Sequence, residues 1–311
     1  QFQAGRINSS CQRKAWDVGS NFTGHLKIEK FFMKYILLVA TLFSLKTFAQ
    51  TNLTFNKRFV ECEDKWVAFS MNKDSSYTFG FIYIDAQAGL TLNREGNFKF
   101  NSDKTVKVEK LKEANIKVRL QANNVKVAVL PEAMYKDLEI EQYPNWLKFY
   151  KTDTTSAKHF YDWGFMYNGW DECAKALSFL ERAKAIDPNY KGLNVELAFS
   201  YNCLSQFDKA EQVLESDVKA NPTDAYINKE YIYTLTKNKK IDIACSQFLK
   251  SITALKDNQY NAENCYNILQ FYYNAKDKSN FKKWYDELGK WQITNKLIRT
   301  YADNMKTEMD K

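Results

Sequence analysis

The chain has 311 residues, with 45 Lys and Arg against 37 Asp and Glu, which gives a formal net charge of +8. Residues 1–49 carry seven of the basic and two of the acidic residues, so the net charge of the remainder is +3. This near balance leaves no dense basic stripe, and we expect no nucleic-acid partner. His159 is the one histidine after residue 49, whereas a His-based metal site needs two or more clustered ligands.

Residues 33–49 have the order of a secretory signal peptide, with a basic start, an apolar run and a small residue before the cut. The apolar run, Tyr35–Leu45, is shorter than the roughly 20 residues that span a membrane. No cysteine stands at the cut, which argues against a lipoprotein anchor. We predict that Met33 is the true start, that residues 1–32 lie upstream of the native protein, and that the mature chain begins near Gln50. A buried N-terminal helix is the alternative.

This order implies an exported bacterial protein, either periplasmic, on the cell surface or secreted, with no transmembrane segment after cleavage.

Residues 51–140 form a β-rich domain, because the stretch from 57 to 130 alternates apolar and polar residues instead of following a helical period. Six segments read as strands of a small antiparallel sheet or sandwich: 66–69, 77–84, 98–100, 106–108, 116–120 and 125–129. Asn123-Asn124 between the last two predicts a hairpin. Pro131 is expected to open a short helix that runs to Leu138, and residues 141–156 read as a linker.

Residues 157–224 contain two consecutive copies of one 34-residue pattern, since Pro188 and Pro222 are 34 residues apart. With proline as position 32, the copies span 157–190 and 191–224. Small residues recur at positions 8 and 20, and large apolar residues at positions 7, 11 and 24. Each copy therefore reads as two amphipathic helices that approach closely and that need neighbouring copies to bury their apolar faces.

Two weaker copies follow, at 225–261 and 262–290, and residues 291–311 read as a capping helix. The whole region from 157 to 290 resembles the tetratricopeptide repeat (TPR), and the plan of signal, strands and repeats resembles secreted bacterial TPR proteins. The expected fold class is α+β multidomain: a small antiparallel β domain followed by an all-α TPR superhelix of about four helix pairs and a capping helix.

The TPR resemblance implies a protein-binding function, with a protein or peptide partner held in the concave groove that the first helices line. The groove residues that the resemblance selects are Tyr161, Phe165, Asn168, Val195, Phe199, Asn202, Tyr226, Lys229, Tyr233 and Tyr266. TPRs that clamp a carboxylate carry Lys and Asn where this chain has Tyr161 and Phe165. We therefore expect an exposed aromatic groove that takes an apolar peptide, in which Phe199 and Tyr233 contribute to binding and not to stability.

Five cysteines follow the signal segment, and export permits disulfides. The repeat positions place Cys173 and Cys203 on facing helix ends, which predicts a bridge between them. Cys245 and Cys265 occupy the corresponding helices of the next two copies in a poorer register, and Cys62 is left over. The alternative is that all five are small buried hydrophobic residues.

We find no pattern that indicates catalysis or a cofactor. His159 reads as a surface or packing residue, and Asp171-Glu172 as acids that begin a helix. The sequence therefore favours a non-catalytic scaffold of the cell envelope or a secreted one, with no cofactor and no metal. A structural component of an envelope complex is the alternative, and an enzyme with an unrecognised site in the β domain is a more remote one.

Overall fold

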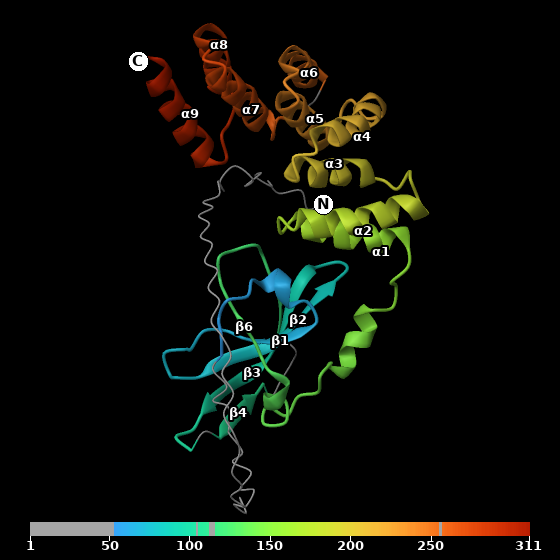
Figure 1. Cartoon of the computed structure of the whole chain (residues 1–311), viewed down its shortest axis with the longest axis vertical. Helices are drawn as coiled ribbons and strands as arrows, with labels where there is room; N and C mark the ends of the chain where they lie inside the picture. Colours follow the sequence, from blue (N-terminus) through green and yellow to red (C-terminus); the bar gives the residue numbers. More distant parts are fainter. Residues whose placement is uncertain (1–52, 104, 112–115, 255–256) are drawn as a thin grey trace, which may run out of the picture.

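The structure is a computed structural model that describes residues 53–311 except 104, 112–115 and 255–256. The predicted signal peptide and the segment before it lie outside the described residues. An antiparallel sheet comes first along the chain and nine α-helices follow within the described part, in agreement with the predicted α+β class. The helices follow a curved path away from the sheet and end at α9 (Figure 1). None of the described helices is long and apolar enough to cross a membrane.

The described sheet has six strands in the order β4-β3-β2-β1-β6, with β5 also paired to β3. The strands are β1 (Lys65–Ala68), β2 (Tyr77–Asp85), β3 (Gly89–Phe100), β4 (Val106–Lys110), β5 (Ile116–Arg119) and β6 (Ala128–Val129). Glycine at 80 permits the close approach of β2 and β3, because a Cβ there would lie 2.4 Å from the Asn93 carbonyl oxygen.

Two local predictions in this region are wrong. β5 and β6 do not form a hairpin, since β5 pairs with β3 and β6 pairs with β1. Apolar alternation identifies a strand but does not select its partner, and here the two strands join different parts of the sheet. The expected helix from Pro131 to Leu138 is reduced to a short 3-10 turn, η2 (Glu132–Met134).

Both faces of the sheet are covered. One face carries Trp66, Phe79, Phe81 and Tyr83, and it packs under residues 130–150, which include η3 (Asn145–Tyr150). Trp146 of η3 lies 4.9 Å from the ring of Tyr83, centroid to centroid. Much of the segment predicted as a linker therefore completes the apolar core of the sheet.

The opposite face of the sheet shares a core with the first helices. Ile82, Ile84 and Leu90 of this face belong to the same buried cluster as Phe160 and Trp163 of α1. The sheet and the helical array are therefore joined through continuous apolar packing and not through a flexible connection.

The helical region consists of four pairs and a last helix. Their bounds are α1 (Ala157–Asn168), α2 (Cys173–Ile186), α3 (Leu193–Cys203), α4 (Phe207–Ala220), α5 (Ala225–Lys237), α6 (Ile241–Ala254), α7 (Asn261–Asn274), α8 (Lys278–Leu288) and α9 (Lys296–Met309). In every pair the turn contains one residue with positive φ, namely Asp171, Ser205, Lys239 and Lys276. The third copy is three residues longer than the 34-residue pattern. The extra residues fall around 255–260, where the sequence lacks the terminal proline of the first two copies.

The small residues of the 34-residue pattern set the distance between paired helices. At position 8 of the first copy, a Cβ on Gly164 would lie 2.4 Å from Cγ of Leu180 in α2. Ala176, Ala198 and Ala210 at the related positions are fully buried. Close packing of this kind explains why a TPR-type pattern needs small residues at positions 8 and 20.

Candidate functional site: the inner face of the helical array

The first helices of the four pairs lie side by side on the inner side of the curve, in the succession α1, α3, α5 and α7 (Figure 1). We call the surface formed by their positions 2, 5, 6, 9 and 12 the inner face. It contains the ten groove residues that the sequence predicts: Tyr161, Phe165, Asn168, Val195, Phe199, Asn202, Tyr226, Lys229, Tyr233 and Tyr266. These residues come from four helices that follow one another in the array.

The expected exposure of this face is wrong for its central part. Phe199, Tyr226 and Tyr233 are 1%, 6% and 8% exposed, so they are enclosed and not presented to solvent. In this part of the array α3 contacts both α1 and α5, and α5 contacts α7. The half-buried residues lie toward the two ends of the face, with Tyr161 and Phe165 on α1 and Tyr266 on α7.

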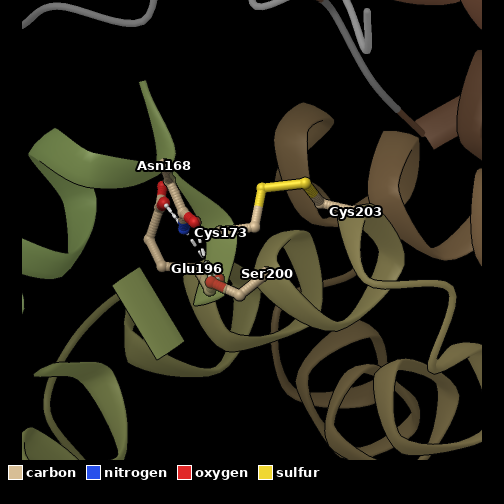
Figure 2. Close-up of a disulfide and its surroundings, with 5 residues drawn as sticks. All are labelled: Asn168, Cys173, Glu196, Ser200 and Cys203. Carbon is tan, nitrogen blue, oxygen red and sulfur yellow. Dashed lines mark hydrogen bonds between the residues drawn. A yellow bond between two sulfur atoms is a disulfide. The ribbon is translucent and has the colours of Figure 1, made fainter. Parts of the chain in front are cut away.

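A row of buried, hydrogen-bonded polar side chains runs along the inner face. Asn168 of α1 donates from Nδ2 to the Glu196 carboxylate of α3 at 2.8 Å and accepts from the Ser200 hydroxyl at 2.7 Å (Figure 2). The next pair of helices repeats this arrangement 34 residues later. There Asn202 donates to Glu230 at 3.1 Å and accepts from Thr234 at 3.0 Å.

This row links each first helix to the next one. Its residues are buried, and a buried polar group that loses its partner costs roughly 1–3 kcal/mol. The asparagines were expected to line a binding groove, but the structure gives Asn168 and Asn202 a role in fixing the repeat spacing. The signal in the sequence was the recurrence of Asn, Glu and Ser or Thr at positions 12, 6 and 10, which the apolar pattern obscured.

An ionic cluster occupies the inner face between α5 and α7. The Lys229 ammonium lies 2.8 Å from the Glu230 carboxylate and 3.4 Å from the Glu263 carboxylate. The rings of Tyr226 and Tyr260 lie 5.5 Å and 5.8 Å from the same ammonium, within the range of cation–π attraction. Sequence reasoning selected Lys229 but missed both of its carboxylates.

The pKa values of Lys229 and Glu263 show how well each charge in this cluster is compensated. Burial alone would lower the pKa of Lys229, but Glu230 and Glu263 outweigh it, and the pKa is raised. Burial raises the pKa of Glu263, an effect that Lys229 opposes and Glu230 reinforces. The ammonium is therefore firmly charged, whereas the Glu263 carboxylate is the less well compensated charge.

A disulfide joins Cys173, the first residue of α2, to Cys203, the last residue of α3 (Figure 2). The Cα atoms are 6.2 Å apart, within the usual range for a disulfide. This is the pairing that the repeat positions indicate. The bridge lies beside the Asn168–Glu196–Ser200 hydrogen bonds and, like them, ties the first pair of helices to the second.

A bridge between Cys245 and Cys265, which their places in the repeats left possible, is absent, since both are free thiols in the structure. Cys245 lies within α6 and contacts the Tyr272 hydroxyl at 3.7 Å, whereas Cys265 is fully buried near the start of α7. The three-residue lengthening between the third and fourth copies shifts the register that a bridge would need. Burial raises the pKa of both thiols, and Cys62 is free as well.

Neither a metal site nor an activated histidine emerges from the described residues. No group of three or more His, Cys, Asp or Glu side chains there could hold a metal ion. His159 packs on Trp163 with ring centroids 4.0 Å apart, and burial lowers its pKa. This geometry fits the packing role that its position in the first repeat suggests.

No protein-family model matches the sequence, and no curated protein matches it. Among solved structures, one described as MamA AMB-1 overlaps 46% of this chain and 77% of its own, at 17% identity and a TM-score of 0.37. A second, described as MamA MSR-1, overlaps 51% of this chain and 88% of its own, at 18% identity and a TM-score of 0.38. The TPR-type description therefore rests on the chain's own repeats and helix pairs, not on these overlaps.

Proposed function

We propose that this chain is a non-catalytic scaffold that binds a protein or peptide partner along the inner face of its TPR-type array. The observation that carries the proposal is the succession of four first helices that collect aromatic side chains inside one curve. Aromatic residues supply much of the binding energy in protein interfaces. Since the centre of the face is enclosed, a partner would first meet its half-buried ends, at Tyr161 and Phe165 on α1 and at Tyr266 on α7.

Export is part of the proposal. The basic, apolar and small-residue order of residues 33–49 supports it, and the Cys173–Cys203 disulfide adds support, because such bonds persist in oxidising compartments. A periplasmic, cell-surface or secreted location would each satisfy both features. N-terminal sequencing of the exported protein should begin at or near Gln50, and an intact segment 1–32 would refute the proposed processing.

The binding proposal is tested by immobilising this protein and capturing its partner from extracts of the source organism. Binding is then measured again with the purified partner. Phe165→Ala should weaken capture by roughly tenfold or more, because a truncated aromatic anchor costs on the order of 2 kcal/mol. The matched control is Phe149→Ala, since Phe149 is an exposed aromatic residue of η3, outside the helical array.

Both variants should keep the melting temperature of the parent protein. Equal loss of capture in both, or unchanged capture with Phe165→Ala, would contradict binding at the inner face. A partner that is retained by the sheet and not by the helices would favour the alternative role in envelope assembly.

A further inference from the structure

The cluster of Lys229, Glu230 and Glu263 contains two carboxylates but one ammonium. It lies where water is largely excluded, since the Lys229 and Glu230 side chains are 2% and 0% exposed. A negative charge in such surroundings is poorly solvated and favours a nearby cation much more than it would in water. The cluster therefore carries a net negative charge on the inner face.

Glu263 is the member of the cluster that a partner could reach. Its side chain is 19% exposed, and it stands in the first turn of α7, whereas Lys229 and Glu230 are closed off on α5. The raised pKa of Glu263 has burial as its main cause and agrees with a carboxylate that lacks full compensation. Lys229 holds this carboxylate in place from the inner side.

The same cluster shows how this face accommodates an ammonium group. Lys229 is held by two carboxylates and lies within cation–π distance of Tyr226 and Tyr260. Carboxylates and aromatic rings together are the chemistry that recognises Lys and Arg side chains. An acidic side chain brought to the same point would meet a like charge in a poorly hydrated setting, which disfavours its binding.

We propose that Glu263 selects the partner of the inner face, favouring a segment that presents a Lys or Arg side chain to the exposed edge of the Lys229–Glu230–Glu263 cluster. This inference rests on the proposed scaffold function and adds the charge of the bound segment. Apolar side chains of that segment would contact the aromatic residues of the face, and its cation would complete the ionic cluster.

The test uses two labelled twelve-residue peptides, one of alternating Lys and Leu and the other of alternating Glu and Leu, with binding followed by fluorescence anisotropy. The Lys-Leu peptide should bind roughly tenfold or more tightly, and the difference should shrink as salt is added. Glu263→Gln should remove most of this preference. Glu215→Gln is the matched control, because Glu215 is a carboxylate on the outer helix α4, paired with Lys219.

Two control measurements accompany the peptide titrations. Phe165→Ala should weaken both peptides alike if they bind the inner face, and thermal melting should show that Glu263→Gln is folded. Equal affinity for the two peptides, or a preference that survives Glu263→Gln, would overturn the selectivity. If neither peptide binds, the cation preference is refuted, whereas capture of a purified protein partner that depends on Phe165 would still uphold the scaffold function.

Discussion

At the scale of single residues, the asparagines at position 12 link the repeats. Each uses both ends of its amide, donating to a glutamate and accepting from a hydroxyl on the next first helix. In the third copy this position is Thr236, whose hydroxyl donates to its own helix at the Tyr233 carbonyl. The row therefore ends there, and the ionic cluster around Lys229 joins α5 to α7 instead.

Replacing Asn168 tests the strength of this link. Asn168→Ala removes a donor from the buried Glu196 carboxylate and an acceptor from Ser200, and it should lower the free energy of unfolding by about 1–3 kcal/mol. Urea denaturation monitored by circular dichroism measures the change. The control is Asn189→Ala in the exposed loop before α3, which should stay within about 0.5 kcal/mol of the parent. Equal effects of the two substitutions would contradict the role assigned to the row.

At the scale of elements, the packing of successive helix pairs depends on more than the apolar repeat. The first two pairs are joined by a disulfide and by the asparagine row, whereas the third and fourth pairs lack such a bridge. Repeat arrays have stabilities that depend on each interface between neighbours. We therefore expect the interface between the first two pairs to be the most sensitive to reducing conditions.

The disulfide is tested by the double variant Cys173→Ser with Cys203→Ser. A bridge that closes a loop of this size, with a sequence separation of 30, stabilises by roughly 3–4 kcal/mol through restriction of the unfolded chain. Denaturation midpoints with and without reductant measure the effect. The parent protein should lose stability on reduction and the variant should not respond, whereas Cys245→Ser should leave the response of the parent unchanged.

At the scale of the whole molecule, a polar contact adds to the apolar core between the sheet and the first helix pair. Glu63, just before β1, accepts hydrogen bonds from the Tyr167 hydroxyl and from Trp163 Nε1, and it pairs with Lys175 at 3.2 Å. Arg58 pairs with Glu172 nearby. These contacts join residues at least 100 positions apart in the sequence and fix how the array leaves the sheet.

The Glu63 contacts predict a pH dependence of stability. Burial alone would raise the pKa of Glu63, but the Tyr167 hydrogen bond and the charge of Lys175 outweigh it, so the folded-state pKa lies below its usual value. A lowered folded-state pKa stabilises the fold above the unfolded-state value of about 4.3 and loses this contribution as the pH falls through the folded-state pKa.

The measurement compares the free energy of unfolding of the parent and of Glu63→Gln between pH 7 and pH 3. The variant should be less stable by about 2 kcal/mol at pH 7, because it loses charge-assisted hydrogen bonds, and the difference should narrow toward pH 3. A difference that is constant across this range would show that the Glu63 charge does not contribute.

The sequence by itself determined the kinds of element and their order. Alternation placed most of the strands, although it gave only the end of β3, at 98–100. The 34-residue spacing of Pro188 and Pro222, with small residues such as Gly164 where helices meet, placed the helix pairs. These features are local or strictly periodic, so they can be read without knowing what lies next to them. The Cys173–Cys203 pairing belongs to the same class, because repeat geometry relates the two positions.

The tertiary structure alone decided which elements meet and what they enclose. It assigned β5 to β3 and β6 to β1, packed the sheet on α1, and enclosed Phe199 and Tyr233 where the repeat pattern suggested an exposed groove. It also placed Glu263 beside Lys229. Glu263 belongs to the fourth copy, whose register the sequence left open. Distant segments of the chain decide which strands pair, whether a helix face is buried and which groups neutralise a charge. A periodic pattern carries no information about these distant segments.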